Sequence, residues 1–378
     1  MKFLIITNVP HLIEKKHIFA YAPYVNEMNI WTKHADDLAI VAPESTQFKT
    51  AIDSAYEHNS IEFVSVKNFD VLSLKNSLLA ISKFPEICWK MYRAMQNADH
   101  IHLRCPGNVG LLGCFVQILF PNKIKTAKYA GNWDPKSKQP WTYKLQQKIL
   151  SNTFWTRNMQ VLIYGEWEGQ TKNCKSFFTA SYFEKEKKAL ITKNLDKKIV
   201  FVFVGALVIG KNPLYAIQLI EQLYRKGFDV SLDLYGEGVE RIVLENYILK
   251  NNLAEVVALK GNQDRETLKM AYQESHFVLL PSASEGWPKA LAEGMFWGCV
   301  PIATAVSCVP YMLDYGKRGV LLEENIREDV SKIASLLNNK EEYVIQQKAA
   351  FTWSQNYTLD VFETEIKKLL VSCVLFKS

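Results

Sequence analysis

Long apolar runs and paired cysteines are both lacking in this chain of 378 residues. No stretch approaches the roughly 18 uninterrupted apolar residues that a membrane-spanning helix needs. The seven cysteines include no Cys-x-x-Cys pair, and their number is odd. These absences argue against a disulfide framework and a structural zinc site, and they are typical of a reducing cytoplasm. The apolar run at the N-terminus is too short for a signal peptide and predicts a first strand, Phe3–Thr7.

Ligand motifs for metals and nucleic acids are also lacking. The sequence contains no Asp-x-Asp motif and no His/Cys grouping with ligand spacing, so we expect neither a bound metal nor a cofactor. We find no recognition-helix or zinc-finger pattern, and we therefore expect no nucleic-acid partner.

Positive charge is present but unevenly distributed. Residues 1–200 carry 27 Lys and Arg against 17 Asp and Glu, whereas residues 201–378 carry 18 against 22. The excess is densest over residues 101–180, with 11 basic and 3 acidic side chains. This asymmetry indicates that the first half faces something anionic, and we favour a membrane surface that carries a lipid-linked acceptor. A basic face that only aids solubility is the alternative.

Strand and helix signals alternate along the chain and restart once. Apolar strands separated by helices predict doubly wound parallel sheets, that is, an α/β fold. The alternation is interrupted by the charged run 184–198 and begins again at Ile199. We therefore predict two Rossmann-like domains that face a cleft. The first covers 1–190 and the second 195–354, and a returning C-terminal helix over 355–378 is predicted to rejoin the first domain.

The most informative stretch is Phe277–Thr304. A buried strand, Phe277–Leu280, leads into a turn of small polar residues and then into a Pro-led helix that Gly298 ends. Glu285 lies in the loop after the strand, and Glu293 lies eight residues later in the helix. Ligands in open α/β sheets bind outside the carboxyl ends of the strands, which is where this loop is expected.

A second strand, glycine loop and helix start occurs at residues 203–213. This geometry offers backbone donors to a phosphate, and Lys211 adds a mobile cation beside it. Turns after the next two strands contain Gly236 and Gly238, then Gly261 and Asn262. Such junctions occur in many α/β proteins, so each is a weak signal alone.

Two loops of the first half are expected at the same edge of its own sheet. One contains Arg104 and Asn108, and the other contains Asn132, Trp133 and Asp134. Arg104, Asn108 and Trp133 are candidates for the acceptor side. Asp134 is a candidate for orienting an acceptor hydroxyl, and an ordinary Asp-Pro turn residue is the equal alternative.

The ordered motifs of residues 203–304 resemble the donor site of the large retaining glycosyltransferase family with the GT-B fold, the glycosyl transferases group 1. The resemblance implies transfer of a hexosyl unit from a nucleotide-sugar, with retention, to a glycan or a lipid-linked saccharide. It implies that Glu285 contacts the transferred sugar, that Glu293 binds the ribose and that Lys211 holds the diphosphate. The catalytic candidates are Glu285, Lys211, Asp134 and Asn132. The implied donor site comprises Gly205, Lys211, Gly236, Gly261, Asn262, Glu285, Gly286, Trp287, Pro288, Lys289 and Glu293.

Two departures from the family pattern leave alternatives open. Ala206 replaces the family's arginine, for which Lys289 or Arg104 could substitute, and no histidine occurs near Asn132. A GT-B-fold nucleotide-sugar epimerase and a non-catalytic nucleotide-sugar-binding protein therefore remain alternatives. We expect a role in polysaccharide biosynthesis and a cytoplasmic location, peripheral on the membrane. The sugar, the base, the acceptor and the oligomeric state are not determined by the sequence.

Overall fold

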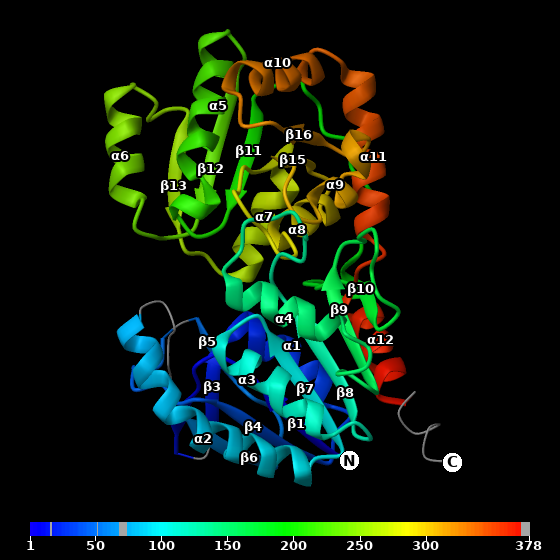
Figure 1. Cartoon of the computed structure of the whole chain (residues 1–378). Helices are drawn as coiled ribbons and strands as arrows, with labels where there is room; N and C mark the ends of the chain where they lie inside the picture. The colour runs from blue at the N-terminus through cyan, green and yellow to red at the C-terminus, as the bar shows by residue number, and fades with distance from the viewer. Residues whose placement is uncertain (16, 51, 68–73, 372–378) are drawn as a thin grey trace. The chain divides into compact units, whose positions relative to one another are not determined.

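The computed structural model describes residues 1–15, 17–50, 52–67 and 74–371 (Figure 1). The chain divides into two compact units, one comprising 1–177 with the chain from Glu363 onward, the other 178–362. The division falls earlier than the boundary that we expected at residues 190–195. It assigns the charged run 184–198 to the second unit.

The first unit is built on a parallel sheet of seven strands, because apolar strands buried on both faces alternate with helices. The sheet order is β10 (Cys174–Phe177), β9 (Met159–Tyr164), β8 (Ile124–Tyr129), β7 (His100–Cys105), β1 (Lys2–Ile6), β4 (Asp37–Pro43), β6 (Ile61–Val66). Its helices are α1 (Ala22–Thr32), α2 (Leu74–Asn97), α3 (Asn108–Val116) and α4 (Trp141–Ser151).

The second unit repeats this architecture with a parallel sheet of six strands. The order is β13 (Val257–Gly261), β12 (Val230–Tyr235), β11 (Ile199–Val204), β14 (Phe277–Leu280), β15 (Val300–Thr304), β16 (Val320–Leu322). Its helices are α5 (Pro213–Arg225), α6 (Arg241–Lys250), α7 (Arg265–Glu274), α8 (Lys289–Phe296), α9 (Val309–Met312), α10 (Ile326–Leu337) and α11 (Lys340–Ser354). The predicted fold class of two doubly wound sheets is therefore confirmed.

The last helix, α12 (Leu359–Val371), belongs to both units. From Glu363 onward it packs with the first unit, where Glu365 pairs with Lys175 at 2.7 Å and Glu363 lies 3.5 Å from Lys33. The predicted return of the C-terminal helix to the first domain is thus confirmed, although residues 372–378 lie outside the described part of the chain.

A small antiparallel sheet in the first unit was not expected from the sequence. It contains β2 (Leu12–Glu14), β3 (His17–Tyr21) and β5 (Asp53–Ala55). His11, which precedes β2, is fully buried and hydrogen-bonds the Val9 carbonyl through Nδ1 and the Tyr56 hydroxyl through Nε2. A catalytic base must reach its substrate, so this buried imidazole serves the core.

Three buried histidines of the first unit, His11, His100 and His102, have lowered pKa values. Burial lowers the pKa of His11 to about 4, against the weaker opposite effect of its bond with Val9. Burial lowers the pKa of His100 to about 3 and that of His102 well below its usual value. Below pH 6.5 the unfolded chain therefore binds protons that the folded chain does not.

We predict that stability falls as the pH drops from about 6.5 toward 4. For His11 alone, the unfolding free energy at pH 5 should be about 2 kcal/mol lower than at pH 7. Thermal unfolding of the wild type and of His11→Gln at pH 7, 6 and 5 measures this, and the variant should show the shallower dependence. His17→Gln is the control because His17 is exposed; an equal slope in all three proteins would contradict the prediction.

Candidate active site

The loops at the carboxyl edge of the second sheet carry the donor-site candidates. Because β11, β12, β13 and β14 are parallel neighbours, the loops that follow them meet at one edge. Lys211 ends a short 3₁₀ turn after β11, and Asn212, in the left-handed conformation at φ 52°, then leads into α5. Glu285 lies in the loop after β14, as predicted.

Lys211 and Glu285 form an ion pair across two of these loops. The Lys211 ammonium lies 2.6 Å from Glu285 Oε1, and the carboxylate side chain is only 7% exposed. Lys211 itself is 31% exposed. The same two loops are joined by the Ala283 amide, which donates to the Gly210 carbonyl at 3.0 Å. The two residues that the sequence singled out separately are thus direct partners.

Glu293, on α8, accepts hydrogen bonds from two side chains of the same unit. Ser181 Oγ donates to Oε1 at 2.5 Å, and the Tyr272 hydroxyl donates to Oε2 at 3.1 Å. Lys289, one turn earlier on α8, lies 3.7 Å from Oε1. Burial, reinforced by Glu293, raises the pKa of Tyr272, which stays a protonated donor. The sequence analysis missed Ser181 and Tyr272, because nothing local marks a partner 112 or 21 residues away.

The glycines of residues 236–238 let the loops pack against one another. A Cβ at Gly236 would lie 1.9 Å from the Gly205 carbonyl oxygen, and one at Gly238 would lie 2.2 Å from that of Leu207. The Gly236 amide also donates to the Gly261 carbonyl at 2.9 Å. Only glycine fits this close approach, so these residues shape the edge of the sheet whether or not they touch a ligand.

Cys308, in the loop after β15, is a further residue that the sequence analysis missed. Its thiol donates to the Gly286 carbonyl at 3.1 Å. Burial, with Glu285 nearby, raises the pKa of this thiol to about 12, so it remains protonated. Its position after a parallel strand was the available signal, since that loop meets the same edge.

In the first unit, Arg104 is held in a buried charge cluster. Its guanidinium lies 2.5 Å from Glu27 Oε1, and the Lys128 ammonium lies 3.0 Å from Oε2. Although burial opposes ionisation, the two cations lower the pKa of Glu27 to about 2. Arg104, 15% exposed, is therefore already engaged. Lys289, the other proposed substitute for the family arginine, lies in the second unit beside Glu293.

The remaining acceptor-side candidates have local structural contacts. Trp133 is buried and packs edge-on against Tyr129 at 4.9 Å, so it is a core residue rather than an exposed sugar platform. Asn132 accepts from the Asp134 amide at 2.9 Å, and Asp134 accepts from the Lys136 amide at 2.8 Å. These bonds match the turn alternative for Asp134. Asn108 begins α3.

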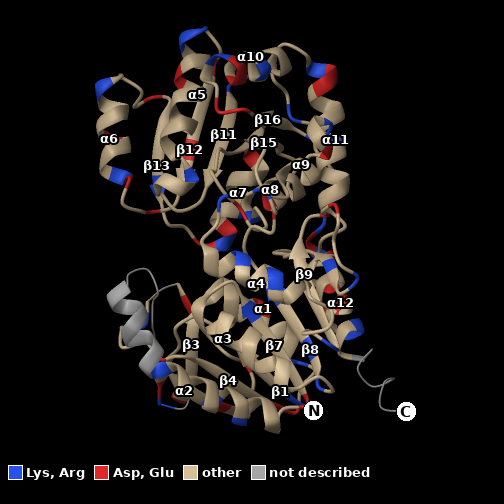
Figure 2. Cartoon of the chain, in the orientation of Figure 1, with Lys and Arg blue, Asp and Glu red and all other residues tan. Residues whose placement is uncertain are grey.

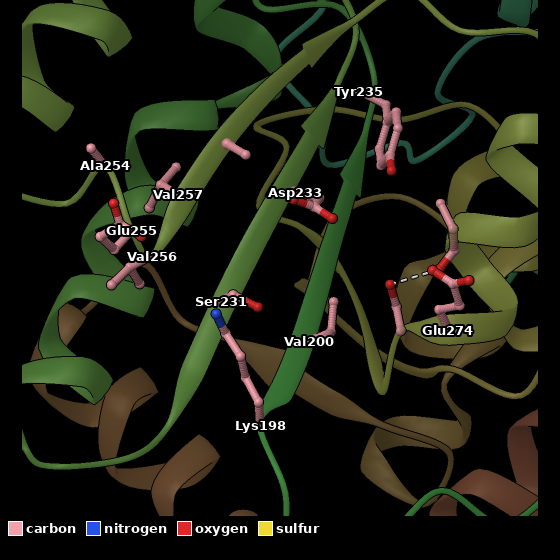
Figure 3. A pocket seen from close by; sticks show the side chains of 13 residues that line it. Lys198, Val200, Ser231, Asp233, Tyr235, Ala254, Glu255, Val256, Val257 and Glu274 are labelled. Carbon is pink, nitrogen blue, oxygen red and sulfur yellow. Dashed lines mark hydrogen bonds between the residues drawn. The ribbon is translucent and has the colours of Figure 1, made fainter.

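A cavity of about 300 Å³ lies on the second sheet and contains none of the donor-site candidates (Figure 3). Asp233, Glu255 and Glu274 line it together with Lys198, which makes it acidic and unsuited to a diphosphate. Over the described ranges, no three His, Cys, Asp or Glu side chains group as metal ligands. None of the helices in the described part of the chain has the length and apolar character needed to cross a membrane.

The whole chain can be superposed on solved structures with the GT-B fold. Sucrose-phosphate synthase from Thermosynechococcus elongatus matches with a TM-score of 0.69 at 14% identity, covering 100% of both chains. HepE of Anabaena, solved with UDP and glucose, matches with a TM-score of 0.68 at 15% identity, covering 98% of this chain and 100% of that one. The two Rossmann-like units therefore define a GT-B fold.

Residues 184–353 match the sequence profile of the family described as glycosyl transferases group 1. An uncharacterized glycosyltransferase of Methanocaldococcus jannaschii is 30% identical over 166 residues, 42% of this chain and 46% of that protein. Protein CapJ of Staphylococcus aureus is 23% identical over 351 residues, 87% of this chain and 81% of that protein. The chain spans less than half of the archaeal relative's length.

We predict that the Lys211–Glu285 pair matters for stability as well as for the site. Lys211→Ala should lower the unfolding free energy by about 1–3 kcal/mol, because it leaves a buried carboxylate without its cation. Adding Glu285→Gln should restore most of this loss, since the buried charge is then gone. Thermal unfolding measures both variants. Lys332→Ala, which removes a surface pair with Glu323, should cost less than about 0.5 kcal/mol; a double variant no more stable than Lys211→Ala would contradict the prediction.

Proposed function

We propose that this protein transfers a hexosyl unit from a nucleotide-sugar to a saccharide acceptor, with retention of configuration. The observation that carries the proposal is the Lys211–Glu285 pair at one sheet edge, with Glu293 on the helix that follows the Glu285 loop, within the segment that matches the glycosyl transferases group 1. We assign the donor to the second unit and the acceptor to the first.

In this proposal the three side chains have separate roles. Glu293 binds ribose hydroxyls, in place of the hydroxyls of Ser181 and Tyr272 that it now accepts from. Lys211, released in part from Glu285, faces the diphosphate, with Lys289 supplying the charge that Ala206 does not. Glu285 accepts hydrogen bonds from the sugar hydroxyls and orients the anomeric carbon.

The proposed reaction exchanges one C–O bond for another and moves one proton. The acceptor oxygen bonds to the anomeric carbon, while the bond from that carbon to the diphosphate oxygen breaks and leaves its electron pair on the diphosphate. The acceptor proton passes to that same oxygen on the same face of the sugar. Lys211 and the start of α5 stabilise the negative charge that develops there.

UDP-sugars are the donors to test first. HepE was solved with UDP and glucose, and the GtfA subunit of Limosilactobacillus reuteri, 28% identical over 132 residues, is named a UDP-N-acetylglucosamine–peptide transferase. Incubation with labelled UDP-glucose and UDP-N-acetylglucosamine separates the alternatives. Free UDP supports transfer or hydrolysis, an isomerised sugar supports an epimerase, and binding without turnover supports a non-catalytic protein.

We predict that Glu285 and Glu293 act on different parts of the donor. Glu285→Gln should lower turnover by about 100-fold and leave UDP affinity nearly unchanged, because it removes only charge-assisted bonds to the sugar. Glu293→Ala should weaken UDP binding by about 10-fold or more, since charge-assisted hydrogen bonds contribute about 1.5–3 kcal/mol. Calorimetry with UDP and a UDP-release assay measure the two effects. If Glu285→Gln lost UDP affinity and turnover to the same extent, Glu285 would contact the nucleotide and not the sugar.

The acceptor proposal includes an anionic membrane surface and a role in polysaccharide biosynthesis. Basic residues occur on α4 (Figure 2), where Lys144 and Lys148 are exposed. Phe115, Leu119, Phe154 and Trp155 are exposed, and the segments that carry them touch where Gln117 donates to the Trp155 carbonyl at 3.1 Å. Aromatic side chains beside cations suit the interface of an anionic bilayer.

We predict salt-sensitive binding to vesicles that contain phosphatidylglycerol. Exposed charges attract over about 8 Å at physiological salt, so binding should weaken as salt is raised. Phe154→Ser/Trp155→Ser should bind less than the wild type in a flotation assay, whereas Tyr224→Ser, which alters an exposed aromatic of the second unit, should not. Absence of binding at low salt would favour an acceptor in solution.

A further inference from the structure

Five aromatic side chains of the second unit pack into one group, which we call the aromatic cluster: Phe178, Trp287, Trp353, Tyr357 and Phe362. The ring centroids of Trp353 and Tyr357 are 4.4 Å apart, those of Trp287 and Tyr357 5.5 Å, and those of Trp287 and Trp353 6.1 Å. Phe178 lies 4.9 Å from Tyr357 and 5.7 Å from Phe362. Phe178, Trp287 and Phe362 are each at most 8% exposed.

The cluster contains both points at which the chain passes between the units. Phe178 is the first residue of the second unit, and Phe362 is its last. Trp287 packs beside Phe178, with the two ring centroids 6.5 Å apart, and Phe178 in turn contacts Phe362. A displacement of either crossing segment must therefore be accommodated by rings that contact Trp287, because buried aromatic groups are closely packed.

Trp287 is joined by two peptide bonds to the proposed sugar-binding carboxylate. Gly286, the residue between them, has its carbonyl fixed by the Cys308 thiol at 3.1 Å, and Glu285 is held by Lys211 at 2.6 Å. Pro288 follows at once and restricts the backbone on the other side. Because Pro288 restricts the backbone on one side of Trp287, a shift of the Trp287 indole is transmitted to the other side, at residues 285 and 286.

We propose that the aromatic cluster couples the two chain crossings to the donor loop, and that Trp287 is a positioning residue for Glu285 rather than a contact of the donor. This inference rests on the proposed function and adds a mechanism that sets the orientation of Glu285 in the same site. A movement of the chain at residues 177–178 changes the orientation of Glu285 through Phe178 and then Trp287, and a movement at residues 362–363 acts through Phe362 on Phe178.

The test compares leucine substitutions inside the aromatic cluster, at Trp287 and Phe178, with one outside it, at Trp297. Trp287→Leu and Phe178→Leu should each lower kcat for UDP release from UDP-glucose by about 10-fold or more, with the UDP dissociation constant within about 2-fold of the wild type. Trp287→Phe should restore most of the turnover. Trp297→Leu is the matched control, because Trp297 is 7% exposed and packs against Tyr182 and Phe296, outside the cluster. Its kcat should remain within about 2-fold of the wild type.

Amide hydrogen exchange provides a readout that does not depend on activity. Phe178→Leu should increase exchange at residues 283–287, and Trp297→Leu should not. A folded Phe178→Leu variant with wild-type kcat and wild-type exchange would overturn the coupling, and a loss of UDP affinity equal to the loss of kcat in Trp287→Leu would make Trp287 a donor contact. If Glu285→Gln retains full turnover, or the wild type releases no UDP, the proposed function fails, and the exchange measurement still decides the coupling.

Discussion

The ion pair between Lys211 and Glu285 is the interaction on which the second unit's sheet edge depends. It bridges the loops after β11 and β14, two neighbouring strands of the sheet, at 2.6 Å. Without a cation, a carboxylate that is 7% exposed would be costly to keep ionised in this position. The pair, the Ala283–Gly210 bond and the close approach of Gly236 to Gly205 therefore hold the loops in one arrangement before any ligand arrives. Preorganisation of this kind is what a site that stabilises developing charge requires.

The fold and the approximate position of this edge could be predicted from the sequence because the signals are local. The run Phe277–Leu280 is a strand buried on both faces, and the helix after Pro288 begins and ends within a residue or two of its prediction. Glu285 and Lys211 each follow a strand, and parallel strands bring such positions to one edge whatever their separation in the chain. The family resemblance added roles to these positions, and the matched segment 184–353 contains both.

The partners of the site residues could not be predicted, since they depend on packing between distant segments. Glu293 is bonded by Ser181, from the crossing segment, and Arg104 is paired with Glu27 on α1, 77 residues away. Trp133 has an aromatic ring on which a sugar could stack, but this ring is buried against Tyr129. Burial and pairing decide what such a side chain can do, and neither is visible in the identity of its neighbours in sequence.

Glu27 and Glu285, two buried glutamates that form ion pairs, show how the same interaction can have different uses. Glu27 is bound by Arg104 and Lys128, whose side chains are 15% and 0% exposed, so opening this cluster would strand several charges away from water. Lys211 is 31% exposed, and water already reaches it, so exchanging Glu285 for an anionic ligand costs it much less desolvation. A diphosphate would offer Lys211 a second anion, while the sugar hydroxyls would offer Glu285 donors in return. In the proposed function a nucleotide-sugar would replace the Lys211–Glu285 pair, whereas the cluster around Glu27 holds α1 against its sheet.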